Sequence, residues 1–361
     1  MTTARKFPYR IEKKKDVGLA VDLLSILVAL VVSIGVAAII IAAAGANAAV
    51  VLWAIVKGSF GSKNAIIDTL IKSTPIMITA LATVVAYRAR VWNIGQEGQL
   101  YAGAIGATFI VLTFPWLNLP AFLYVPLLLV ASVIGGAIWG GVPGWLKAKY
   151  NVNEIVVTVM FNYIMLYVTA FLLGGVWQEE GSHYFNTIRF PDSTAIPSFF
   201  GSRLHTGFGM ALLLAVGVWF LLYKMKLGYE IRAMGINPTA ARYKGIAIQK
   251  IILLVMLLSG GISGLAGGIE LLATQHRLIY GFSAAFGFTG ILIALLGRLH
   301  PLGVTIAAIF FGALQNGSSA MIIYSNVPRQ LVTMIMGLVI IMLLLFEALF
   351  KYRVRRVGHV D

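Results

Sequence analysis

The feature that most constrains this chain is a succession of apolar stretches, each about long enough to cross a lipid bilayer. The first apolar run extends from Leu23 to Val56 and contains no charged residue. A membrane-spanning helix needs about 20 mostly apolar residues. Ten stretches approach this length, at 23–45, 65–86, 94–114, 121–145, 155–175, 207–223, 249–272, 282–297, 301–320 and 330–350. The pattern predicts an all-α integral membrane protein with about ten transmembrane helices.

The composition agrees with lipid as the main solvent of the chain. Hydrophobic residues make up 59% of the sequence and charged residues only 11%, whereas soluble domains carry about a quarter charged residues. The run from Leu23 to Val56 is also too long for the apolar core of a cleaved signal peptide, which has about 7–15 residues. We therefore expect an uncleaved first span.

The positive charges predict how the spans are oriented. The sequence has 28 Lys and Arg against 13 Asp and Glu, and a net charge of +15. If the N-terminus is cytoplasmic, ten spans place 21 of the 28 cations on the inside, as the positive-inside rule requires. This favours a cytoplasmic N-terminal segment (1–22), a transmembrane domain (23–350) and a cytoplasmic tail (351–361). The cations form no aromatic-interleaved stretch, so we expect no nucleic-acid partner.

Spans 2–5 and 7–10 of this topology would run in opposite orientations, which leaves room for an inverted repeat. Two connections between spans are long. The predicted outside loop, 176–206, is polar and irregular, and the predicted cytoplasmic loop is 224–248.

The cytoplasmic loop has the residues of two short, capped helices. Tyr229–Met234 predicts a helix that Gly235 stops, Asn237 is a good N-cap for a second helix, and Pro238 suits its first position. Gly245 stands where a C-terminal cap glycine is common. Such an element can dock on another protein, or it can lie on the membrane surface as a connector.

A polar segment precedes the third span, with Asn93, Gln96 and Glu97 among glycines. One interpretation is a plain helix start, in which Asn93 is the N-cap and Glu97 interacts favourably with the helix dipole. The other is a broken helix whose polar end lines a pathway. On a continuous helix, Glu97 could also pair with Arg90.

Two further segments place polar or aromatic groups inside predicted spans. Thr158 and Asn162 are four residues apart and share a helix face, and Tyr163 follows them. A buried Asn needs partners, so Asn162 either bridges helices or faces a pore. The stretch that carries Phe282 and Phe288 is rich in glycine and favours a broken or re-entrant segment. Its rings could stack on a planar ligand or belong to an interfacial aromatic belt.

Several classes of chemistry have no basis in the sequence. There are no cysteines, no Gly-x-x-x-x-Gly-Lys-Ser/Thr phosphate loop, and no zinc spacing among the five histidines. We find no nucleophile with a base, so we expect no catalytic residues, no metal and no cofactor. Together with the predicted spans, these observations favour a transport protein over a membrane enzyme.

These motifs resemble those of a known family. The matching stretches are Tyr87–Gly103 around Asn93-Ile-Gly-Gln-Glu-Gly-Gln, Gly140–Tyr163, Gly228–Gly245, and Gly281–Gly303 around Ala294-Leu-Leu-Gly-Arg-Leu-His-Pro-Leu-Gly. The chain resembles permeases of bacterial ABC importers of the branched-chain amino acid/ribose type. Within that family it is similar to the larger permease of nucleoside, or simple sugar, importers.

The resemblance implies a set of partners in a bacterial cytoplasmic membrane. They are a homologous second permease, a cytoplasmic ATP-binding subunit and an extracytoplasmic substrate-binding lipoprotein, with membrane lipid around them. ATP would then bind only to the partner subunit. The implied ATPase-coupling residues are Gly228, Glu230, Arg232, Gly235, Asn237 and Arg242. The candidates for the translocation path are Asn93, Gln96, Glu97, Thr158, Asn162, Tyr163, Phe282 and Phe288.

Three functions remain open from the sequence alone. The first is import of nucleosides, which suits a path with few intramembrane charges and with Asn, Gln, Thr, Tyr and Phe at the candidate positions. The second is import of a monosaccharide or another small solute by the same machine. The third is an ion-coupled secondary transporter, against which the lack of a cluster of acidic residues argues.

Overall fold

The structure is a computed structural model that describes residues 9–13, 19–43, 45–117, 119–199, 201–325 and 352–356, and scattered positions from 334 to 349. Most of the predicted span 330–350 lies outside the described residues, as do most of the predicted terminal segments 1–22 and 351–361. The chain divides into two compact units. Unit 1 comprises Met1–Gly58 and Gly317–Asp361, and unit 2 comprises Ser59–Asn316.

Helices dominate the described residues. In chain order the elements are β1 (Tyr9–Lys13), α1 (Leu19–Ala43), α2 (Ala48–Phe60), α3 (Lys63–Arg88), α4 (Gln96–Thr113), α5 (Ala121–Tyr150), α6 (Glu154–Leu173), η1 (Asp192–Thr194), α7 (Gly207–Lys224), α8 (Lys226–Ile236), α9 (Pro238–Tyr243), α10 (Ile248–Glu270), η2 (Leu271–Gln275), α11 (Phe286–Leu296), α12 (Pro301–Ser325) and β2 (Tyr352–Arg356).

Six helices among the described residues are long and apolar enough to cross a membrane. They are Lys63–Arg88, Ala121–Tyr150, Glu154–Leu173, Gly207–Lys224, Ile248–Gln275 and Pro301–Ile322. This confirms a mostly helical protein with several candidate membrane spans. The count of ten spans, the inverted repeat and the sides on which the termini lie stay predictions. Helix α11 has only 11 residues, fewer than a full span needs.

Unit 1 departs from the all-α prediction by one small sheet. Strands β1 and β2 pair antiparallel, with Tyr9 opposite Arg356 and Glu12 opposite Arg353. This long-range pairing cannot be read from either segment alone. Unit 1 also contains most of α2, which we did not predict as a separate helix. Gly58 of α2 lies against Gly317 and Ala320 of α12.

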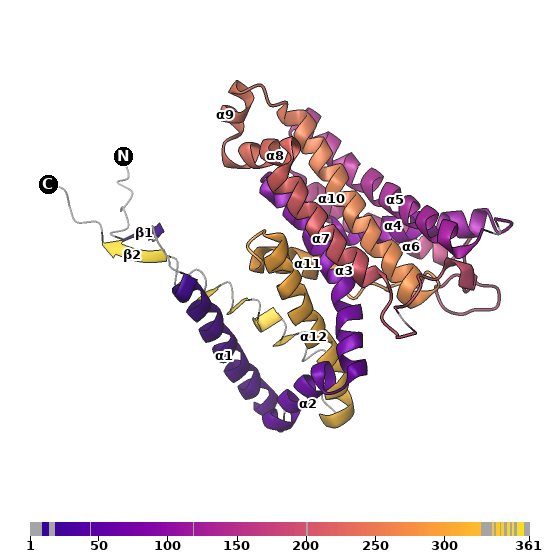
Figure 1. The fold of residues 1–361 in the computed structure, drawn as a ribbon, viewed down its shortest axis with the longest axis horizontal. Helices are drawn as coiled ribbons and strands as arrows, with labels where there is room; N and C mark the ends of the chain where they lie inside the picture. Colours follow the sequence, from indigo (N-terminus) through magenta and orange to yellow (C-terminus); the bar gives the residue numbers. More distant parts are fainter. Residues whose placement is uncertain are drawn as a thin grey trace, which may run out of the picture. The chain divides into compact units, whose positions relative to one another are not determined.

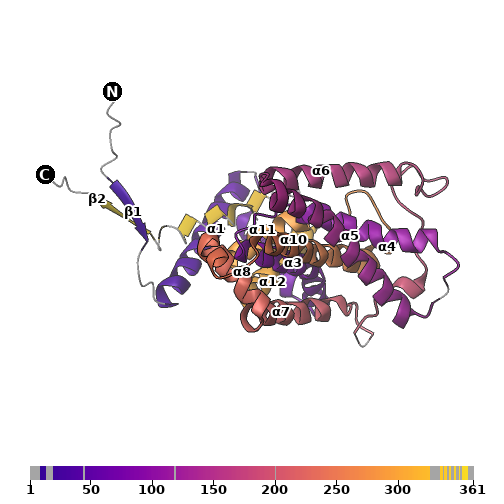
Figure 2. The same ribbon diagram turned by 90° about the horizontal axis from the view of Figure 1, so that it is seen from above.

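Unit 2 is a bundle built around α10, which contacts α3, α4 and α5. Helix α6 packs on α4 and α5, and α7 packs on α3, so α6 and α7 lie on opposite flanks of the bundle (Figure 2). The two short helices α8 and α9 lie at one end of unit 2 (Figure 1). Helix α7 connects that end to the opposite end, where the loop of residues 174–206 lies.

Glycine lets the central helices of unit 2 touch backbone to backbone. A Cβ atom on Gly264 of α10 would lie 2.8 Å from the Cα of Gly136 in α5, and a Cβ on Gly140 would lie 3.0 Å from the Cα of Gly260. Small residues of this kind allow close helix packing where lipid provides no hydrophobic drive. The glycines of the apolar runs therefore set the spacing of α5 and α10.

Replacing Gly264 with leucine is expected to destabilise unit 2 strongly. The new side chain would meet the carbonyl of Ser132 and the backbone of Gly136, neither of which can rotate away. Overpacking of this kind costs about 1–3 kcal/mol or more. Gly217→Leu is the matched control, because a Cβ there meets nothing within 4 Å. Thermal unfolding in detergent should show a large loss for Gly264→Leu only, and equal midpoints would contradict the account.

Candidate functional site

The connection between α3 and α4, residues 89–95, is not helical, and we call it the break. Side-chain amides stabilise it. Helix α3 ends at Arg88 and α4 begins at Gln96. Asn93 in the connection accepts a hydrogen bond from the amide of Gly95 (2.9 Å) and donates to Ser259 Oγ of α10 (3.0 Å). Asn93 and Gln99 also exchange reciprocal bonds of 3.1 Å. Helix α4 starts at this point with Glu97 in its first turn, as the helix-start interpretation expects, although Gly95 rather than Asn93 is its N-cap residue. That this polar end lines a pathway stays a prediction.

Helix α6 supplies hydrogen-bond partners for backbone groups at the break that have no partner within a helix. Thr158 Oγ1 accepts from the amide of Ile94 (3.1 Å), and Asn162 Oδ1 accepts from the amide of Gly98 (2.8 Å). Asn162 also donates to the carbonyl of Ile94 (2.8 Å). The first amides of a helix have no partner within it, so α6 satisfies groups that the break leaves open. Of the two roles predicted for Asn162, the structure displays the helix bridge.

Glu97 lies on the first turn of α4 and joins it to α11. Its side chain is buried, and Oε2 accepts from the amide of Gly287 at 2.8 Å. Among the described residues no ion pair joins Glu97 to Arg90, because the chain leaves the helix before α4 begins and Arg90 adopts φ 55°. One turn further along, the ring of Tyr101 packs edge-on against Phe282, with centroids 4.7 Å apart. The stretch before α11 is not helical, and α11 begins only at Phe286. That this stretch is a broken or re-entrant membrane segment stays a prediction.

Gln96 differs from its neighbours in the break. It is fully buried, yet neither its amide nitrogen nor its oxygen has a hydrogen-bond partner among the described residues. An unpaired buried polar group costs about 1–3 kcal/mol. Native structures contain few such groups, and each one calls for an explanation such as a functional role. Gln96 is therefore a stronger candidate for function than its bonded neighbours.

The remaining two path candidates are exposed on unit 2. Tyr163 is 54% exposed and Phe288 is 37% exposed. Tyr163 lies next to the buried Asn162, but on the outward face of α6. Six of the eight predicted residues are therefore buried near the first turns of α4 and α11. The other two, Tyr163 and Phe288, are aromatic residues at the surface.

The predicted coupling segment folds as two short helices, with one boundary different from the prediction. Asn237 caps α9 by accepting from the amide of Ala240 (3.0 Å), and Pro238 is the first residue of α9. Gly245 adopts φ +82° just after the helix ends. Gly235, however, does not stop α8, which runs to Ile236. Its absent side chain instead allows α8 to pack on the end of α3.

The contact between α8 and α3 combines a glycine with two arginines. A Cβ on Gly235 would collide with the carbonyl of Arg88. Arg88 donates to Tyr223 Oη (2.9 Å) and to the carbonyl of Leu299 (2.9 Å). Arg232 of α8 lies over the same Tyr223 ring, 5.1 Å from its centroid, and donates to the carbonyl of Leu222. The end of α3 therefore holds α8 firmly, directly before the break.

The outer side of this segment is open. The groove between α8 and α9 has a volume of about 360 Å³ and is lined by Tyr229, Arg232, Ala233, Ile236, Asn237, Ala240, Ala241 and Lys244. Ile236 and Tyr243 are exposed apolar side chains beside exposed cations such as Arg242. Glu230 makes only a long ion pair with Lys226, at 3.9 Å. Exposed apolar and charged groups on one rigid element suit a protein contact.

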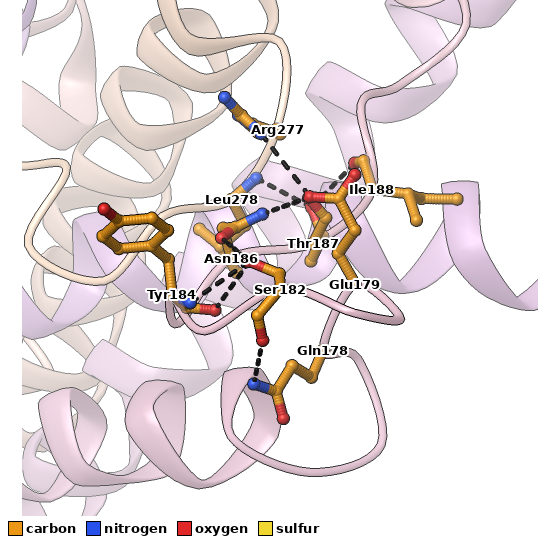
Figure 3. A network of polar contacts seen from close by, with 9 residues as sticks. All are labelled: Gln178, Glu179, Ser182, Tyr184, Asn186, Thr187, Ile188, Arg277 and Leu278. Carbon is orange, nitrogen blue, oxygen red and sulfur yellow. Dashed lines mark hydrogen bonds and ion pairs between the residues drawn. The ribbon is translucent and has the colours of Figure 1, made fainter.

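The loop at the opposite end of unit 2 is ordered by a polar network (Figure 3). Asn186 donates to Glu179 at 2.7 Å, and Glu179 forms an ion pair with Arg277 at 3.6 Å. Thr187 and Leu278 bond through Leu278 N to Thr187 Oγ1 (3.1 Å) and Thr187 N to the Leu278 carbonyl (3.0 Å). This loop is therefore fastened to the connection between α10 and α11.

His205 gives the loop end a pH dependence. It is buried, and burial lowers its pKa to about 4. The unfolded chain binds this proton below about pH 6.5 whereas the folded chain does not, so stability falls as the pH drops from 6.5 towards 4. At pH 5 the loss is about 2 kcal/mol. Thermal midpoints at pH 7 and pH 5 should differ less in His205→Gln than in wild type. His183→Gln, at an exposed site, should behave like wild type, and an unchanged pH dependence in His205→Gln would be the contrary result.

Sequence reasoning missed several residues of this arrangement. Ser259, Tyr223 and Arg88 hold the break and α8, but Ser259 is 166 residues from Asn93 and Tyr223 is 135 residues from Arg88. Glu270 is a buried carboxylate at the end of α10, bonded by Gln275 at 3.0 Å next to the π-helical turn η2. A lone acid in the apolar run 251–275 is a pointer that the sequence did contain.

Comparison with known proteins identifies the family. The family described as "Branched-chain amino acid transport system / permease component" matches residues 65–344. The chain belongs to this permease family. The matched range covers the break, both short helices and α11, so the features described above are all part of the permease region. The chain is therefore a multi-pass membrane protein of an ABC transport system.

Three relatives of this permease are similar over most of its length. The guanosine ABC transporter permease NupP of Bacillus subtilis is 35% identical over 87% of this chain and 91% of its own. The glucose ABC transporter permease TsgB13 of Haloferax volcanii is 33% identical over 80% and 78%. The nucleoside ABC transporter permease NupB of Lactococcus lactis is 31% identical over 78% and 79%. All three are transport components rather than enzymes.

Proposed function

We propose that this chain is the transmembrane permease subunit of a bacterial ABC importer for nucleosides. The observation that carries the proposal is its similarity, over 87% of its length, to a guanosine permease, together with the similarity to a second nucleoside permease. A homologous second permease would form the other half of the path. A separate cytoplasmic subunit would bind and hydrolyse ATP, and an extracytoplasmic lipoprotein would deliver the substrate.

The path in this proposal runs beside the two helix starts of unit 2. Tyr163 and Phe288 have exposed rings that can stack on a nucleobase, and Gln96 has an amide without a partner among the described residues. Asn93, Glu97, Thr158, Asn162 and Phe282 are buried around them and support this wall. A neutral, hydroxylated solute needs uncharged hydrogen-bonding groups and aromatic faces, which this set provides.

The ATPase would dock on α8 and α9, in the predicted cytoplasmic loop 224–248. The groove of about 360 Å³ and the exposed Ile236 and Tyr243 support this placement. Gly235 contacts the end of α3 directly, and Arg232 reaches it through Tyr223 of α7, so these contacts link the segment to the break. The loop of residues 174–206 would then face the outside and meet the binding protein.

A second substrate class follows from the glucose permease among the relatives, which supports a monosaccharide as the alternative. The two are separated by reconstituting the permease with its second permease, ATPase and binding protein. ATP hydrolysis is measured with guanosine, adenosine, uridine, glucose and ribose. We expect stimulation by one or more nucleosides. Stimulation by the sugars alone would replace nucleosides with sugars as the substrate.

A further inference from the structure

Helix α11 is a half-length helix whose first residues are buried in unit 2. Its 11 residues extend about 16 Å, roughly half the thickness of a bilayer core. Phe286 and Gly287 at its start are buried, and Ala285 before them adopts φ 58°. A Cβ on Gly287 would lie 2.6 Å from the Cα of Glu97, so the starts of α4 and α11 touch backbone to backbone.

The Glu97 carboxylate binds this helix start through several donors. The amide of Gly287 donates at 2.8 Å, and the Ser283 side chain and the amide of Phe288 interact with the same carboxylate. Among the described residues, no Lys, Arg or His forms an ion pair with Glu97. Its side chain lies instead at the amino-terminal ends of two helices, since Glu97 also lies on the first turn of α4. One side chain of the first turn of α4 therefore accepts a hydrogen bond from the first turn of α11.

Helix α11 is connected to both ends of unit 2. The segment before it bonds to the loop of residues 174–206, through Tyr280 N to the carbonyl of Phe185 (2.9 Å) and through the Thr187 and Leu278 pair (Figure 3). After α11, the carbonyl of Leu299 accepts from Arg88, which shares Tyr223 with Arg232 of α8. A displacement of α11 would therefore shift both the loop of residues 174–206 and the helices α8 and α9.

We propose that Glu97 is the positioning residue that keeps α11 docked on α4 during transport. It acts through the geometry of α11 and does not itself bind the substrate. When the carboxylate is replaced by an amide, the amide of Gly287 is left with a weaker acceptor, and α11 moves away from α4 and α3. The connection from the loop end to α8 then no longer transmits motion. Only the uptake part of the test rests on the proposed nucleoside import.

The absence of native cysteine allows a direct test of α11 docking. Ala294 of α11 is fully buried, so Ala294→Cys is a reporter that reacts slowly with a small thiol reagent when α11 is docked. In purified full-length protein, Glu97→Gln should raise the labelling rate at least fivefold. Glu154→Gln is the matched control, because Glu154 is also a buried first-turn acid but pairs with Lys147 at 3.0 Å. Its labelling rate should stay within twofold of wild type.

Uptake by the reconstituted complex completes the test. Glu97→Gln should lower uptake at least tenfold, Glu97→Asp should restore part of it because the charge is kept, and Glu154→Gln should stay within twofold. If Glu97→Gln does not accumulate, Ser283→Ala keeps the carboxylate and should raise labelling two- to threefold. Equal labelling rates in the Glu97 and Glu154 variants would overturn the inference whatever the substrate is. If the labelling rates behave as expected but the wild-type complex takes up no nucleoside, the proposed substrate is wrong and the role of Glu97 stands.

Discussion

Replacing Gly235 with leucine is expected to abolish substrate uptake while the assembled complex still hydrolyses ATP. Gly235 lies directly on the carbonyl of Arg88, and a side chain there would push α8 away from the end of α3. The proposed ATPase subunit would still bind the exposed face of α8 and α9. Its movement would no longer be transmitted to the break before α4. Uptake should fall at least tenfold, with ATP hydrolysis within about twofold of wild type.

Two controls make this result specific to the α8 contact. Gly217→Leu adds the same side chain to a helix position with open space around it and should preserve uptake. Arg232→Ala removes the contact with Tyr223 from the same helix and should also uncouple, less completely. Coupled uptake in Gly235→Leu would show that α8 does not act through α3.

Replacing Asn162 with leucine is expected to destabilise the permease and to stop transport. The leucine has a similar size, but the amide of Gly98 and the carbonyl of Ile94 lose their partner. Each buried group left unpaired costs about 1–3 kcal/mol. The start of α4 would then lose its fixed position beside α6. We expect a stability loss of about 2–4 kcal/mol and at least a tenfold lower uptake.

Thr169→Val is the matched control for Asn162→Leu. Thr169 lies on the same buried face of α6, but its hydroxyl donates only to the carbonyl of Met165 in its own helix. Its replacement should change stability by less than about 1 kcal/mol, since that carbonyl already accepts within the helix. Thermal unfolding and uptake are measured for both variants. A similar response of the two would mean that the bridge to the break is unimportant.

Local sequence rules predicted the elements whose stability is decided locally. Asn237 and Pro238 predict the start of α9 because a cap and a fixed φ act within one turn. The spacing of Thr158 and Asn162 predicts their shared face for the same reason. Apolar runs likewise predict the long helices, because length and hydropathy suffice.

The parts that were missed depend on contacts between distant segments. Gly235 would stop an isolated helix, yet α8 continues because the glycine packs on Arg88 of α3. A continuous helix would have allowed Glu97 to pair with Arg90, but its partner is the amide of Gly287, 190 residues later. The pairing of β1 with β2 joins the two ends of the described chain. None of these pairings leaves a pattern in the sequence around either residue.

The central claim is that this permease moves its substrate only with the energy of a separate ATPase. The most direct test is uptake of radiolabelled nucleoside into proteoliposomes that contain the permease pair, with the ATPase and binding protein added or omitted. We predict uptake only when ATPase, ATP and binding protein are all present, and uptake that persists when ionophores collapse the ion gradients. Uptake without the ATPase that ionophores abolish would contradict the account and indicate an ion-coupled transporter.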